Sequence, residues 1–200
     1  MPDRASTDEE IASRALVMIG AKPLTSFGDG TVEATAAATI YEDVVTQVMC
    51  ATRWRFASSQ IKMNRLASPP AGRWTVAWQL PADLVNIITV TDPQSIDDGG
   101  NVYGNIRFDR YGDKLYTGNH ADLILDYIRR VPTASWPPFF VMPVIHLLAS
   151  ELAIAVAQNE ALSDLHAGKY VTFLQQGKTT DAQGRTNSVL DTQAFLRARR

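Results

Sequence analysis

The chain has 200 residues, of which 46% are apolar and 20% charged, so it can bury a core without disulfides or a structural metal. Its net charge of −2 does not mark it as a nucleic-acid binder, and a signal peptide is not expected because Arg4 and the acidic residues 8–10 interrupt its start. The single cysteine, Cys50, excludes an intrachain disulfide and is expected to be a small buried residue of a protein made in a reducing cytosol.

The charges are unevenly distributed along the chain. Residues 1–52 carry three basic and eight acidic residues, a net charge of −5. Residues 53–135 have a net charge of +2 and residues 136–200 a net charge of +1, and the last four residues include Arg197, Arg199 and Arg200. Such asymmetry is typical of surfaces that meet a partner.

Two helices are predicted in the first quarter of the chain. Ser6 with Glu9, or Thr7 with Glu10, has the spacing of a capping box, and Gly20 supplies the stop of this helix. A second helix is expected to begin near Asp29 or Thr31. Its apolar face has helical spacing and consists of Ala34, Ala37, Ala38, Tyr41, Val44, Val45 and Val48.

The pattern between about 54 and 131 predicts strands. Residues 74–80 alternate between apolar and polar side chains, and residues 84–91 are rich in β-branched types. A hairpin is predicted with Gly112 in its turn, followed by a strand over 122–131. Together these segments indicate one small antiparallel sheet or barrel of roughly five strands.

Helices return after Trp136. The third is expected from about 139 to 158, and its nearly continuous apolar run is interrupted by His146 and Glu151, which favours a buried core helix over a membrane span. The fourth is expected from about 163 to at least 176, with Leu162, Leu165, Tyr170 and Leu174 facing inward. The polar end is expected to be an arm that orders on a partner.

These elements predict an α+β fold in which an N-terminal and a C-terminal helix pair, over 1–53 and 136–178, form a four-helix body. A β-rich insertion would occupy 54–135, and a C-terminal arm would occupy 179–200.

Motifs for catalysis or for a cofactor are incomplete. Residues 176–179 end like a phosphate-binding loop, but Thr172 stands where the first glycine is needed, and the approach is helical. Residues 28–30 begin like a dinucleotide fingerprint, but Glu33 replaces the third glycine. We therefore expect no catalytic, cofactor-binding or metal-binding residues and no enzyme.

The histidines do not have the spacing of a metal site, and the acidic residues leave one catalytic alternative open. No histidine has a second ligand at helical spacing: His120 is expected in a loop, His146 in the core and His166 on a helix surface. Paired carboxylates of a glycoside hydrolase remain an alternative, since their spacing is three-dimensional. The candidates are Asp109, Asp113, Asp122 and Asp126.

Arginines beside aromatic residues leave a second alternative, a nucleic-acid-binding module. Two segments place arginines next to aromatic residues: Arg53-Trp54-Arg55-Phe56 and Arg73-Trp74. Such aromatic rings can stack on the bases of single-stranded nucleic acid while the arginines contact its backbone. The preferred interpretation is that the aromatic residues anchor the core and the arginines lie at its rim.

Several segments together resemble the tail tubular protein A family of short-tailed phages and the related head–tail adaptors of other phages and gene transfer agents. The resemblance covers about residues 6–180. Its segments, in order, are Ile11–Leu16 with Ile19-Gly20, Trp54-x-Phe56-Ala57, Trp78-x-Leu80-Pro81-x-Asp83, Asp126-Tyr127-Ile128 with Val131, and Ala149-x-x-Leu152-Ala153. The structural anchors expected from it are Trp54, Phe56, Trp78, Pro81, Asp83 and Tyr127.

The resemblance implies a structural subunit of a ring of about twelve copies in the virion, at the head–tail junction, assembled in the host cytoplasm. Such a ring lies beneath the portal protein, joins it to a downstream tail or nozzle protein, and lets DNA pass through its lumen without specific binding; no membrane is involved. The family's C-terminal arm enters the portal. In this sequence the residues of that arm would be Leu190, Phe195, Leu196, Arg197, Arg199 and Arg200. The alternative function is a tail-associated hydrolase of envelope polysaccharide.

Overall fold

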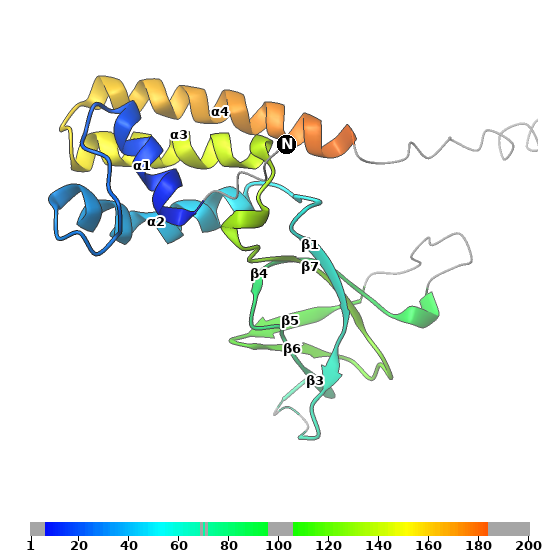
Figure 1. The fold of residues 1–200 in the computed structure, drawn as a ribbon. Helices are drawn as coiled ribbons and strands as arrows, with labels where there is room; N and C mark the ends of the chain where they lie inside the picture. The colour runs from blue at the N-terminus through cyan, green and yellow to red at the C-terminus, as the bar shows by residue number, and fades with distance from the viewer. Residues whose placement is uncertain (1–6, 69, 71, 96–105, 184–200) are drawn as a thin grey trace, which may run out of the picture.

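The structure is a computed structural model, and it describes residues 7–183 except 69, 71 and 96–105. It has four α-helices and two small antiparallel sheets, arranged as a helical body beside a β unit (Figure 1). The helices are α1 (Asp8–Met18), α2 (Val32–Cys50), α3 (Pro138–Ala155) and α4 (Glu160–Gln183). The strands are β1 (Ser58–Lys62), β2 (Asn64–Arg65), β3 (Val76–Gln79), β4 (Leu84–Thr91), β5 (Phe108–Tyr111), β6 (Lys114–Thr117) and β7 (Ile124–Arg129).

Side-chain caps fix where the first two helices begin. The Thr7 hydroxyl accepts the Glu10 amide N–H, and the Glu10 carboxylate accepts the Thr7 amide N–H, so the predicted capping box at these two residues is confirmed. Thr31 caps α2 by accepting the N–H of Ala34. The predicted turn glycine, Gly20, has a φ of 76°, a conformation that ends a helix without strain only in glycine.

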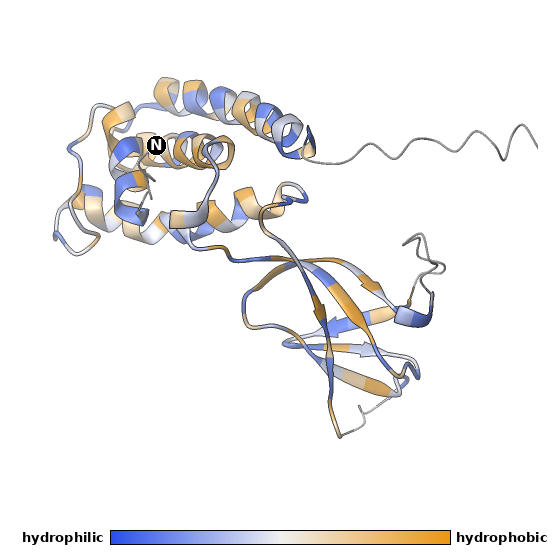
Figure 2. Ribbon diagram, turned by 45° about the vertical axis from the view of Figure 1, so that its right-hand side comes forward, coloured by the Kyte–Doolittle hydropathy of each residue, from blue (hydrophilic) through white to orange (hydrophobic). Residues whose placement is uncertain are grey.

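Helix α3 is the centre of the helical body. It packs against α1, α2 and α4, whereas α1 and α2 meet over a small area, where the Tyr41 hydroxyl donates to the Asp8 carboxylate at 3.0 Å. By length and composition α3 could cross a membrane, but 67% of it is buried, and its ribbon, coloured mostly as hydrophobic, lies among the other helices (Figure 2). Packing inside the body therefore accounts for its apolar surface.

The β unit consists of a three-stranded sheet in the order β1-β7-β4 and a four-stranded sheet in the order β2-β3-β6-β5. The chain passes from one sheet to the other at Met63, which is buried. The two sheets enclose a common core that includes Trp78, Leu115 and Leu125. Gly112, with a φ of 60°, opens the two-residue turn between β5 and β6, so the predicted hairpin is confirmed.

The predicted fold class is wrong in two respects. A single sheet or barrel of about five strands was expected, but there are two sheets, because the polar strands β1 and β2 have no alternating apolar pattern that would reveal them. The first two helices were expected to form a pair, but each packs separately on α3. In addition, residues 179–183 of the expected arm still belong to α4.

An ion pair ties the end of β7 to α2. The Arg130 guanidinium donates two hydrogen bonds to the Glu42 carboxylate, with N···O distances of 2.8 and 2.9 Å, and stacks over Trp136. Two parallel bonds give this pair a fixed geometry that a single contact lacks. It therefore helps to set how the β unit meets the helical body.

Candidate functional site

The candidate site is the junction where α2 ends, the β unit begins and α4 finishes. Trp54 is fully buried there, and its indole N–H donates to the Val48 carbonyl at 2.8 Å. Its ring meets Phe140 edge-on at 5.2 Å between centroids, and it stacks on Phe139 at 6.3 Å. Phe56 joins the cluster through a 4.9 Å contact with Phe140, so two segments far apart in sequence are held together.

Gly177 brings α4 close to this aromatic cluster. A Cβ atom added to Gly177 would lie 2.9 Å from the Phe139 carbonyl oxygen and 3.2 Å from the Trp54 ring. The first contact is with backbone, which cannot move aside as a flexible side chain could. Gly177 therefore serves helix packing, and the residues that looked like the end of a phosphate loop lie inside a helix.

The other expected anchors lie around the β unit. Trp78 is buried in the β core, where its indole N–H donates to the Thr117 hydroxyl at 2.9 Å. Tyr127 donates to the Asp83 carboxylate at 3.2 Å, and burial raises the pKa of this tyrosine. Pro81 lies in the turn before β4. The structure thus brings Trp54 together with Phe56, and Asp83 together with Tyr127. Trp78 and Tyr127 both belong to the core of the β unit, whereas Trp54 belongs to the core of the helical body.

A cationic groove lies at the outer edge of the junction. It has a volume of ≈ 600 Å³ and is lined by Thr52, Arg53, Arg55, Ser58, Lys178, Asp181 and Ala182. The Asp181 carboxylate accepts the backbone N–H of Arg55 at 2.8 Å, which fastens the end of α4 to the start of the β unit. Arg73, the third arginine of the predicted cluster, is instead paired with Asp109 in the β unit and lies over the Trp74 ring.

The carboxylates considered for glycoside hydrolysis each have a partner on a neighbouring segment. Hydrogen bonds from Arg73 to Asp109, and from Gln79 to Asp113, lower the pKa of both carboxyl groups. A glycosidase needs a general acid whose pKa is raised, so these two acids have the opposite character. The other two, Asp122 and Asp126, pair with side chains of β1.

Two histidines that were not expected to meet form a buried pair between α3 and α4. Their Nδ1 atoms are 3.0 Å apart, so one ring donates to the other, and His146 also stacks on Phe173. Burial lowers the pKa of His146 to about 4, and burial likewise lowers the pKa of His166, with Lys169 acting in the same direction on both. The predicted core position of His146 is confirmed, whereas the predicted surface position of His166 is wrong.

Two predictions about single side chains are wrong, and the loop before α2 has a defined turn. Cys50 is exposed, not buried, because the last residue of α2 points away from the face that packs on α3. Leu165, expected to face inward, is half exposed. In the loop before α2, the Asp29 carboxylate accepts two backbone N–H groups, from Thr25 and Ser26, and Gly30 has a φ of 71°, as a turn requires.

Among the residues that the structure describes, no group of three or more His, Cys, Asp or Glu side chains could hold a metal ion. The expected arm residues Leu190, Phe195, Leu196, Arg197, Arg199 and Arg200 lie outside the described residues. No protein-family model matches the chain, and no curated protein matches it in sequence.

Replacing Gly177 with alanine should destabilise the protein by about 1–3 kcal/mol, because the new methyl group would collide with the Phe139 carbonyl and push α4 from the junction. The matched control is Gly168→Ala in the same helix, where an added Cβ meets nothing within 4 Å. The control should instead gain about 1 kcal/mol in free energy of unfolding from its higher helix propensity. Urea unfolding of both variants measures this, and equal stabilisation by the two substitutions would contradict the role given to Gly177.

The histidine pair should make the protein sensitive to mild acid. The unfolded chain binds more protons than the folded chain between the ordinary pKa of 6.5 and the lowered value of about 4, so stability falls as pH falls through this window. Between pH 7 and pH 5 the loss should be on the order of 1–2 kcal/mol. Thermal unfolding across this range measures the loss.

The variant that tests this assignment is His146→Phe/His166→Phe, which should unfold with little dependence on pH over the same range. His120→Gln is the control, since His120 lies in a loop and pairs with Asp92 outside this interface, and it should keep the acid sensitivity of the wild type. The assignment fails if the double variant is as sensitive to acid as the wild type.

Proposed function

We propose that this chain is a structural subunit of a phage-type head-to-tail adaptor ring, at the head–tail junction of a virion assembled in the host cytoplasm. The ring docks beneath the portal protein, connects it to a downstream tail or nozzle protein, and forms part of the channel through which DNA leaves. The chain acts by assembly and not by catalysis, and it crosses no membrane.

The observation that carries the proposal is where the family-like segments lie in the fold. The segment containing Trp54 and Phe56 packs against α3, and the segment containing Asp83 is hydrogen bonded through that side chain to the one containing Tyr127. These contacts are compatible with the helix–β–helix layout that the resemblance implies.

The charge of the chain fits a channel through which DNA must slide. A lumen that neutralised many phosphates would bind DNA tightly, because each neutralised phosphate releases counterions. The net charge of −2 keeps such binding weak over the molecule as a whole. The positively charged groove does not conflict with weak DNA binding if a neighbouring subunit covers the groove in the assembled ring.

The C-terminal residues after α4 supply the contact with the portal in this proposal. Because Asp181 fastens α4 to the β unit, a truncation has to spare α4, and the suitable cut follows Gln183. The shortened chain, residues 1–183, should unfold within about 1 kcal/mol of the full chain but lose at least about tenfold in affinity for its portal. Co-sedimentation with the portal measures docking.

A full-length chain in which residues 184–200 are scrambled is the matched control, since it keeps the length and composition of the tail. It should fail to dock as the truncated chain does. If either variant docks with the affinity of the wild type, the assignment of the arm is wrong.

A further inference from the structure

The cationic groove at the junction has no internal charge balance. Arg53, Arg55 and Lys178 line it together with one carboxylate, that of Asp181. Both arginines are exposed, and none of the three basic side chains takes part in the four ion pairs found over the described part of the chain. Like charges gathered around one hollow repel each other, so an anionic partner would stabilise them.

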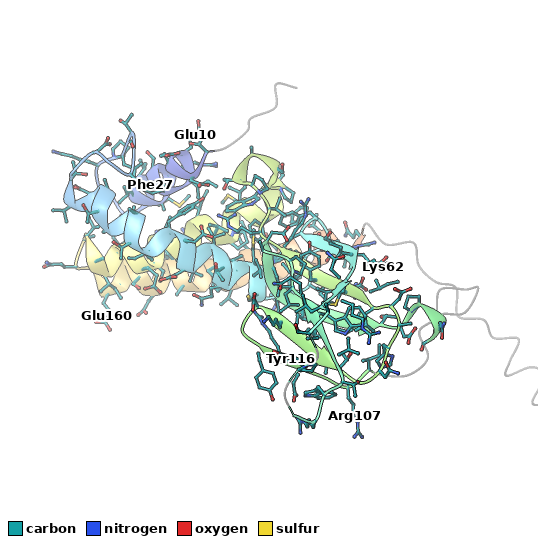
Figure 3. The ribbon with its side chains drawn as sticks, turned by 90° about the horizontal axis from the view of Figure 1, so that it is seen from below. Glu10, Phe27, Lys62, Arg107, Tyr116 and Glu160 are labelled. Carbon is teal, nitrogen blue, oxygen red and sulfur yellow. The ribbon has the colours of Figure 1, made fainter. Side chains whose placement is uncertain are left out.

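A second groove has the complementary character. It has a volume of ≈ 420 Å³ at the start of α1 and is lined by Thr7, Glu9, Glu10, Ser13, Arg14, Leu24 and Thr25. It shares no residue with the cationic groove, and Glu10 lies on the helical body away from the β strands (Figure 3). Residues 7–52, the segment that contains all of its lining residues, carry seven acidic and two basic residues.

We infer that the surface around Glu9 and Glu10 of a second copy of this chain packs over the cationic groove around Arg53, Arg55 and Lys178. Because two different surfaces meet, the contact is head to tail, and repeated copies form a ring when the rotation closes. This inference rests on the proposed function, for which it supplies the contact between neighbouring subunits.

The composition of the groove favours a protein partner over the phosphates of DNA. Asp181 lines the groove, and its negative charge would repel a phosphate chain lying there, whereas the second groove also carries a positive charge, on Arg14, that a protein partner can place near Asp181. Thr52 adds a hydroxyl group that can donate a hydrogen bond to a carboxylate. Binding of duplex DNA in the groove is the competing outcome.

Charge reversal on the full-length protein tests the contact. One variant carries Arg53→Glu and Arg55→Glu, a second carries Glu9→Lys and Glu10→Lys, and a third carries all four substitutions. Sedimentation velocity at low ionic strength, over about a hundredfold range of concentration, measures self-association. Arg110→Glu, on the exposed strand β5, is the matched control for reversing an arginine outside the groove.

Each of the first two variants should associate at least about tenfold more weakly than the wild type, because like charges then face each other. The four-substitution variant should recover most of the loss, since the pairing is restored with opposite sign, and the control should behave as the wild type. Circular dichroism checks that all variants are folded, because Glu10→Lys also removes half of the capping box.

Three results would overturn the inference. The wild type could remain monomeric at all concentrations, the first variant could associate as well as the wild type, or the first variant could lose affinity for labelled duplex DNA with no change in self-association. None of these results decides the proposed function, which is tested separately by docking to the portal. Normal docking combined with any of them would leave the adaptor role standing and remove only this contact.

Discussion

The packing around Trp54 is the constraint on which the rest of the structure depends. Its fully buried indole lies at the end of α2 and packs against Phe139 and Phe140 at the start of α3. Helix α4 comes so close to the same ring that only glycine fits at position 177. Trp54 also lies just before β1, so the β unit leaves the helical body from a fixed point. An aromatic cluster of this kind resists rotation, because its members cannot move independently in a close-packed interior.

The packing at this junction also determines the shape of the cationic groove and the position of the end of α4. The hydrogen bond between Asp181 and the Arg55 backbone holds the last turn of α4 beside the start of the β unit, and the cationic groove exists only because these two segments are adjacent. Helix α4 therefore ends beside the groove, which Ala182 lines. In the proposed ring, the contact between neighbouring copies would lie next to this end of α4.

Local signals were enough to predict the helices and the β5–β6 hairpin, because caps, glycines and periodicity act within a few residues. Strands β1 and β2 were missed because they are polar and depend on pairing with β7 and β3, which are far away in the sequence.

The histidine pair was missed for a different reason. His146 and His166 lie at similar distances along the chain from the turn over residues 156–159, so antiparallel packing of α3 and α4 brings them together. The histidine pair could therefore have been predicted once the turn was located. The close approach of Gly177 to Trp54 depends on tertiary packing, which the spacing of residues in the sequence does not indicate.

Electron microscopy of the purified chain mixed with its portal tests the adaptor role most directly. If the chain is an adaptor, an added layer should appear beneath the portal, with rotational symmetry of about twelve and the β unit in the same place in every copy. A portal that remains bare at saturating concentrations of the folded chain would contradict the adaptor role.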